Sequence, residues 1–218
     1  MKKYLFNSKI KIHDGILPSF TDEQIKNEPM IWRATGKWAY EHGGIITRTF
    51  LNEIKKVRGD YENCICDSRS HMHMKNWYPA IPGYHHDTVP RTRSDKQPNY
   101  DTPEYKANHI MTLINGDCCP TQFAIGECEL EEVPLNEIVY KIWHEKIIEL
   151  LNDKKLKLMN IPTNKLIEFD YQAFHQAQKA VNRGWRWFGR ATFNTTVEPA
   201  NEIRQQVQVY LENLMEGW

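Results

Sequence analysis

The sequence WRWFGRATFN occupies residues 185–194 and directly follows the turn Asn182-Arg183-Gly184. Its aromatic residues and its opening turn predict a β-strand. Side chains two residues apart lie on the same face of a strand. One face of this strand therefore carries four side chains, Arg186, Phe188, Arg190 and Thr192. A buried arginine needs an anionic partner, and its planar fork suits a carboxylate. If this face lines the inside of a barrel, a dicarboxylate molecule is a natural counter-ion.

Further strand-like and helical segments surround this one. The predicted strands lie within residues 61–84, 109–114, 121–125 and 166–171. The turn Asn115-Gly116-Asp117 predicts a hairpin between the second and the third of them. Helical spacing of apolar residues covers 38–56, with an interruption at Gly43-Gly44, then 135–152, and finally 203–218. The middle of the chain is thus β-rich and its flanks are helical, so the sequence predicts a mainly β fold with flanking helices.

The chain shows no linker-like stretch, so residues 1–218 are predicted to form a single domain. Residues 88–108 contain three prolines, several charges and few apolar side chains. They are predicted to form a long surface loop, and such loops in compact domains often serve as lids or binding segments.

Composition disfavours several classes of protein. The 28 Lys and Arg residues balance 28 Asp and Glu residues, and this zero net charge argues against a protein that coats nucleic acid or an anionic membrane. The 7 Trp, 10 Tyr and 8 Phe residues supply enough apolar area for a core. Because the chain has neither a membrane-spanning apolar run nor a signal-peptide pattern, we expect a cytoplasmic protein. Its five cysteines, an odd number, are expected to be reduced thiols.

The densest cluster of chemically active side chains lies in the stretch IPGYHHDTVPR, residues 81–91. On a strand, His85 and Asp87 lie on the same face, so both can reach one cation. The adjacent pair His86 and Asp87 is less suitable, since neighbouring strand residues face opposite ways. The tripeptide alone is also compatible with a loop histidine that is hydrogen-bonded to a nearby aspartate.

A second histidine, His175, lies far downstream and is followed by the two arginines of the first stretch. Arg186 comes 11 residues after it and Arg190 comes 15 residues after it. Two histidines and one carboxylate on one face of a metal leave three positions open. Non-haem Fe(II) oxygenases use this arrangement because the iron must bind a cosubstrate and dioxygen together.

The ordered set His85, Asp87, His175 and Arg186 or Arg190 resembles the pattern of the Fe(II)- and 2-oxoglutarate-dependent dioxygenases. In that superfamily His-x-Asp/Glu is followed by a distal His and then by an Arg, often as Arg-x-Ser, and Arg190-Ala191-Thr192 is similar to that last element. The resemblance covers residues 69–91 and 169–193. Two arginines compete for the cosubstrate, and the spacing favours Arg186 slightly.

The resemblance implies a double-stranded β-helix, which is a jelly-roll, cupin-like barrel. It implies that His85, Asp87 and His175 hold Fe(II), and that Arg186 or Arg190 binds the far carboxylate of 2-oxoglutarate. Thr121 is a further candidate for a hydrogen bond to the cosubstrate. The implied reaction uses dioxygen and is usually a hydroxylation. The substrate, a small molecule or a side chain of a larger one, is not identified by the sequence.

Other interpretations and other residues stay open. A cupin-like metal-binding protein or isomerase would keep the histidines without needing the arginines, and a non-catalytic β-sandwich would use the histidines structurally. His71 and His73 are predicted to belong to the barrel wall, with a possible place in the substrate pocket. His144 is predicted at the surface or its boundary. Arg69 and Arg91 flank the motif in the sequence, and Arg91 suits either a salt bridge or a substrate contact.

Overall fold

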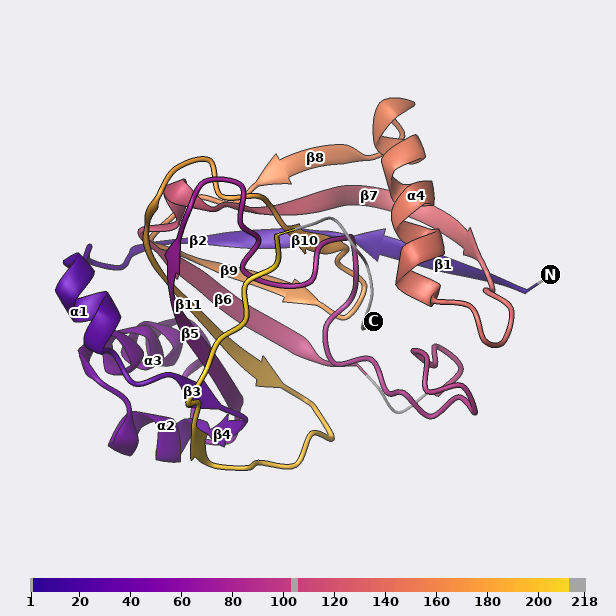
Figure 1. Cartoon of the computed structure of the whole chain (residues 1–218). Helices are drawn as coiled ribbons and strands as arrows, with labels where there is room; N and C mark the ends of the chain where they lie inside the picture. Colours follow the sequence, from indigo (N-terminus) through magenta and orange to yellow (C-terminus); the bar gives the residue numbers. More distant parts are fainter. Residues whose placement is uncertain (1, 103–105, 212–218) are drawn as a thin grey trace.

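Two antiparallel β-sheets form the centre of the computed structural model, which describes residues 2–102 and 106–211. The larger sheet has the spatial order β2 (Ile10–Ile16), β9 (Lys165–Asp170), β6 (Asn108–Ile114), β11 (Gly184–Phe193), β5 (Ile65–His73) and β4 (Ala34–Thr35). In the smaller sheet β7 (Thr121–Glu131) pairs with β1 (Lys3–Ser8), β8 (Lys157–Asn160) and β10 (His175–Ala177). The predicted mainly β fold with flanking helices is confirmed (Figure 1).

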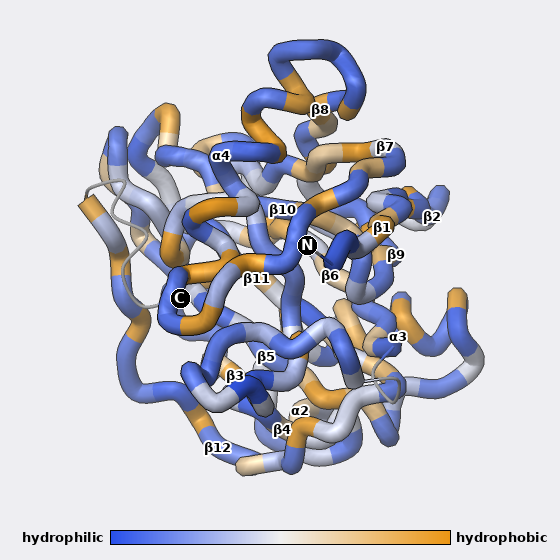
Figure 2. The backbone as a smooth tube through the Cα atoms, turned by 90° about the vertical axis from the view of Figure 1, so that its right-hand side faces the viewer, coloured by the Kyte–Doolittle hydropathy of each residue, from blue (hydrophilic) through white to orange (hydrophobic). Residues whose placement is uncertain are grey.

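The helices cover the outer faces of the two sheets. On the larger sheet lie α1 (Asp22–Asn27), α2 (Gly36–His42) and α3 (Ile45–Arg58), and on the smaller sheet lies α4 (Val139–Asn152). Figure 1 shows the first three helices together on one side of the molecule and α4 on the other. Seen from the side, α4 and β8 lie at one end, whereas α2, β4 and β12 (Glu202–Ile203) lie at the opposite end (Figure 2).

The predicted interruption at Gly43-Gly44 separates α2 from α3 and is fixed by a buried carboxylate. Glu28 accepts hydrogen bonds from the backbone N–H groups of Gly44, Ile46 and Thr47 at 2.8–3.1 Å. These groups belong to the first turn of α3, where a helix leaves its N–H groups without partners and favours negative charge. The break in the helical pattern is therefore the capped N-terminus of a second helix, not a weak point of one long helix.

Strand β11 shows the two-residue alternation that its sequence predicts. Trp187 and Ala191 are fully buried and pack in the core formed with α1, α2 and α3. The intervening residues line a cavity between the sheets, namely Arg186, Phe188, Arg190 and Thr192. Since β11 pairs with β5 on one side and β6 on the other, this alternation places arginines in the interior of the sandwich.

The remaining space between the sheets is filled by an apolar cluster. Met111 and Leu113 of β6 pack there with Phe123 of β7 and with Ile167 and Phe169 of β9. Each of these side chains is at most 3% exposed. The interior is thus part core and part cavity.

Two predicted elements are wrong. Asn115-Gly116-Asp117 does not close a hairpin, because β6 is already paired on both sides, by β9 and β11, and the chain passes instead to the other sheet through the 3₁₀ turn η1 (Gly116–Cys118). The helix expected from residue 203 onward is absent through residue 211, and residues 212–218 lie outside the described part.

The segment after β11 is extended because tertiary pairing overrides its helical spacing. Strand β12 pairs with β3 (Ile31–Trp32), and the backbones of Tyr78 and Tyr210 form an isolated β-bridge. Residues 196–210 therefore form a strap along the cavity, which Thr196, Val197, Arg204 and Tyr210 help to line. Among the described residues no helix is long and apolar enough to span a bilayer.

The close packing of β11 gives a first testable prediction. A Cβ atom at Gly189 would overlap the ring of Trp187, which is fully buried. Because overpacking a rigid core is unfavourable, Gly189→Ala is expected to lower the free energy of unfolding by about 2 kcal/mol or more. Chemical denaturation measures this loss.

Gly15→Ala is the matched control. A Cβ there meets no atom closer than 3.5 Å, the distance to Glu53 Oε2, so its unfolding free energy should stay within about 0.5 kcal/mol of the parent value. Equal stability of both variants would contradict the packing described for Trp187.

Candidate metal centre

A cavity of about 620 Å³ opens between the sheets and collects the residues singled out by the sequence. All six predicted site residues line it: His85, Asp87, Thr121, His175, Arg186 and Arg190. They come from both sheets and from the loop before β6. The fold thus brings together side chains that lie far apart in the chain.

The side chains of His85, Asp87 and His175 converge in this cavity. Each offers one ligand atom, and these atoms lie within 4.8 Å of one another. Asp87 Oδ2 is 3.1 Å from His175 Nε2, and Asp87 Oδ1 is 3.9 Å from His85 Nε2. These spacings suit a group that could hold a metal ion.

Backbone pairing sets the positions of the two histidines. His175 is the first residue of β10, and His85 forms a β-bridge with it. Each backbone N–H donates to the other residue's carbonyl, at 3.0 and 3.2 Å. The predicted strand character of the motif is therefore limited to one bridge, which nevertheless places Asp87, two residues on, next to both imidazoles.

Side-chain bonds hold the rest of the motif loop. The Tyr140 hydroxyl on α4 donates to the carbonyl of His86 at 2.9 Å. The backbone N–H of Tyr84 donates to His144 Nδ1 at 3.1 Å. His144 lies at the boundary of the protein, half-buried, as predicted. Tyr140 carries no sequence signal beyond its place on a predicted helix.

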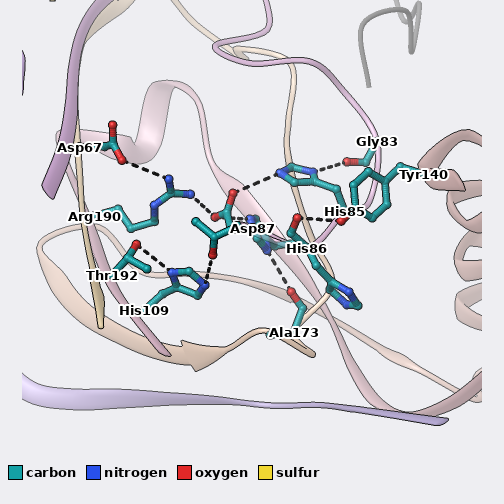
Figure 3. A network of polar contacts seen from close by, with 12 residues as sticks. Asp67, Gly83, His85, His86, Asp87, His109, Tyr140, Ala173, Arg190 and Thr192 are labelled. Carbon is teal, nitrogen blue, oxygen red and sulfur yellow. Dashed lines mark hydrogen bonds and ion pairs between the residues drawn. The ribbon is translucent and has the colours of Figure 1, made fainter. Parts of the chain in front are cut away.

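The imidazole rings are oriented so that each Nε2 faces the carboxylate. His85 Nδ1 lies 2.9 Å from the carbonyl oxygen of Gly83, and His175 Nδ1 lies 3.0 Å from that of Ala173. A carbonyl oxygen can only accept, so both Nδ1 atoms carry the proton and both Nε2 atoms present a lone pair. Figure 3 shows the His85 ring between Gly83 and Asp87.

The charge states also suit a cation. Burial lowers the pKa of His85 to about 3, so its imidazole is neutral near pH 7. Burial alone would raise the pKa of Asp87, but Arg190 and His175 outweigh it and hold that pKa well below its usual range. A charged carboxylate and neutral imidazoles are the forms that ligate metals.

Arg190 is fixed by two carboxylates. Its guanidinium contacts Asp87, and it donates to Asp67 Oδ2 at 3.3 Å (Figure 3). The Arg190 side chain is 16% exposed, and the two aspartate side chains are 18% and 15% exposed. Asp67 was not singled out from the sequence, although it alternates with Arg69 and His71 along a predicted strand.

Arg186 is differently placed. It is 4% exposed, and Nη1 donates to the carbonyl of Cys119 at 2.6 Å. Its Nε atom has no hydrogen-bond partner, and no carboxylate of residues 2–102 or 106–211 pairs with it. Thr121, also buried, lines the same cavity from β7. Arg186 is thus a buried cation whose fork is open to an anion.

Other residues noted in the sequence lie around this group. His71 and His73 stack on each other with ring centroids 4.9 Å apart and belong to the wall of β5, as predicted, outside the cavity lining. Arg91 is exposed at the cavity and donates to the carbonyl of Lys96 at 3.4 Å. Arg69 lines the cavity and is considered below.

Comparisons with known proteins add little to this geometry. The sequence matches no protein family and no curated protein. One solved structure, "CytC3 with Fe(II) and alpha-ketoglutarate", aligns over 89% of both chains with 9% sequence identity and a TM-score of 0.36. A likeness at this identity and TM-score does not place the chain in a family.

The buried histidines predict how stability depends on pH. Burial is the largest cause lowering the pKa of four of them, to about 2 for His71 and to about 3 for His73, His85 and His109. Their pKa in the unfolded chain is about 6.5. Above that pH both states are neutral, and below it the unfolded chain binds protons first.

Stability should therefore fall as the pH drops from 7 to 5, by about 1.4 kcal/mol per pH unit for each such histidine once the pH is below 6.5. Urea unfolding at pH 7, 6 and 5 measures the slope. Replacing His71 and His73 by Gln should flatten it. An unfolding free energy that stays constant between pH 7 and 5 would contradict the burial of these imidazoles.

Proposed function

We propose that this protein is a non-haem Fe(II)- and 2-oxoglutarate-dependent oxygenase that hydroxylates its substrate. The observation that carries the proposal is the convergence of His85 Nε2, His175 Nε2 and the Asp87 carboxylate within 4.8 Å, in a cavity that also holds the unpaired Arg186. A metal-binding group and a buried cation in one cavity suit a dianion that chelates the metal at one end and pairs with the cation at the other.

The donor set fits iron. Two imidazole nitrogens and one carboxylate suit Fe(II) and leave positions open for further ligands. When bound, Fe(II) with 2-oxoglutarate and dioxygen supplies the oxidation of a substrate C–H bond, while 2-oxoglutarate becomes succinate and carbon dioxide.

The chain's own part is positioning. The carbonyls of Gly83 and Ala173 hold the two imidazoles in the ligating tautomer. Arg190 orients the Asp87 carboxylate through its own contacts with Asp87 and Asp67. Since Arg190 already has carboxylate partners, we assign the far carboxylate of 2-oxoglutarate to Arg186, whose fork can bind it bidentately.

Thr121 is proposed to donate its hydroxyl hydrogen to the same carboxylate. Its side chain lies on β7, across the cavity from the β11 arginines. Burial of this end of the cavity strengthens such charged hydrogen bonds, because little water competes for them.

The strand order supports a jelly-roll, in which the whole chain, residues 1–218, forms one domain. Successive segments alternate between the facing sheets. Strand β5 belongs to the larger sheet, and residues 84–86 join the smaller sheet through His85. Strand β6 then belongs to the larger sheet and β7 to the smaller sheet. After β8, strands β9, β10 and β11 alternate in the same way. Double-sheet jelly-rolls of this kind include the cupins.

The test is turnover of 2-oxoglutarate by the protein reconstituted anaerobically with Fe(II) and then exposed to oxygen. We expect succinate to form, slowly and without added substrate. Asp87→Ala and His175→Ala should abolish both iron binding and succinate formation, since each removes a ligand. His42→Ala, at an exposed histidine on α2, should change neither.

Arg186→Ala should raise the KM for 2-oxoglutarate at least about tenfold while iron still binds, because a charge-assisted pair is lost. The same increase in Arg190→Ala alone would assign the cosubstrate to Arg190 instead. Full turnover in Asp87→Ala or His175→Ala would overturn the proposal. Iron binding without succinate would favour a cupin-like metal protein that does not use 2-oxoglutarate.

A further inference from the structure

The cavity wall carries more positive than negative charge beyond the metal group. Six arginines line it, Arg33, Arg69, Arg91, Arg186, Arg190 and Arg204, and its acidic lining residues are Asp67 and Asp87. Under the proposed function, Asp87 would ligate the metal ion and Arg186 would bind the cosubstrate. Arg69 and Arg204 are then left facing the cavity with a single carboxylate, Asp67, nearby.

Arg69 is a partly buried cation that forms no direct ion pair within the described residues. It lies on β5 opposite Phe188, between the positions that face Arg186 and Arg190. No hydrogen bond or ion pair joins its side chain to the rest of the described chain. Burial and the nearby Arg190 charge lower the pKa of Arg69, and the more distant charges of Asp67 and Asp87 offset this only in part. A partly buried guanidinium with no partner is unfavourable unless a ligand neutralises it.

Arg204 reaches the same place from the strap. Its backbone N–H donates to the carbonyl of Met30 at 2.7 Å, and β12 next to it pairs with β3. The Arg204 guanidinium lies over the Trp32 ring, 3.9 Å from the ring centroid. Its Nε atom has no hydrogen-bond partner. The strap therefore holds a stacked, partly unsatisfied guanidinium at the cavity.

Asp67 is shared by two arginines, with Oδ2 facing Arg190 and Oδ1 facing Arg204. Asp67 lies 3.3 Å from Arg190 and 3.9 Å from Arg204. Burial and the charges of Arg69 and Arg190 lower the pKa of Arg204 to about 10, against the raising effect of Asp67. The positive charges of Arg69, Arg190 and Arg204 thus outnumber the one negative charge of Asp67 at this point.

We propose that Arg69 and Arg204 bind an anionic group, a carboxylate or a phosphate, on the primary substrate. This inference rests on the proposed function in that it assigns the anion to the substrate of that site. At Arg204 this group lies apart from the carboxylate assigned to Arg186, and Arg69 lies between the two positions. Arg204 adjoins Asp67, which pairs in register with Arg190, and Arg190 is four residues from Arg186, roughly 13 Å along the strand.

Binding of small anions tests the proposal directly. Inorganic phosphate and acetate are titrated separately into the full-length, metal-free protein without 2-oxoglutarate, by isothermal titration calorimetry. We expect saturable binding of at least one anion, and the anion with the higher affinity identifies the substrate's anionic group as a phosphate or a carboxylate. Arg69→Gln and Arg204→Gln should each weaken it at least about tenfold, since a hydrogen bond to a charged group is lost.

Arg48→Gln is the matched control, because Arg48 is exposed on α3 and away from the cavity lining. It should leave the affinity unchanged. Arg69→Gln should melt no lower than the parent, since it removes an unpaired charge. A purely structural arginine would give the opposite, a lower melting temperature with unchanged anion affinity.

Three results would overturn the proposal: no saturable binding of either anion, unchanged affinity in both Gln variants, or loss of binding in Arg186→Gln alone. The last would place the anion in the pocket assigned to 2-oxoglutarate. Failure of the proposed function would give a different experimental result from failure of this proposal. It removes succinate formation and leaves the anion titration as described, because the titration uses neither iron nor 2-oxoglutarate.

Discussion

Strand β11 is hydrogen-bonded along most of its length to β5 on one side and to β6 on the other. Its two-residue period divides its side chains between two environments. Trp187 and Ala191 enter the helix-covered core, and Arg186 and Arg190 enter the space between the sheets. A shift of one residue in register would exchange these environments and bury the arginines against the helices. The core and the site therefore depend on the same pairing.

Placing arginines inside a sandwich requires anions to accompany them. Arg190 has two, Asp67 and Asp87, and through Asp87 it is connected to both histidines of the candidate metal centre. The network keeps the carboxylate charged in a buried place, which a metal ligand requires. Arg186 and Arg69 have no such partner among the described residues. This contrast is the basis on which we propose that Arg186 and Arg69 bind ligands, whereas Arg190 serves the protein's own structure.

Much of the site could be predicted because its signal is local. The strand period places Arg186 and Arg190 on one face, and the spacing of His85 and Asp87 puts both within reach of one ion. Strands β5, β6 and β11 have long apolar or alternating runs, so they were visible as strands. The Gly43-Gly44 break was visible for the same reason, as an interruption of a regular helical pattern.

The rest depends on pairing between distant segments, which a single sequence does not display. Strands β8 and β10 have 4 and 3 residues, too few to show a period. The strap carries apolar residues at helical spacing, yet its backbone bonds to β3 and to Tyr78 make it extended. Arg204 and Asp67 were missed for this reason. Arg204 lies on a segment that was predicted to be helical, and Asp67 gains its role only when β5 pairs with β11 and brings it beside Arg190.

The most direct test of the central claim is a crystal structure of the protein reconstituted anaerobically with Fe(II) and 2-oxoglutarate. The account predicts iron bound by Nε2 of His85, Nε2 of His175 and the carboxylate of Asp87, with the far carboxylate of 2-oxoglutarate on Arg186. Iron bound elsewhere, or a cavity in which Asp87 keeps its contact with Arg190 and ligates no metal, would contradict it.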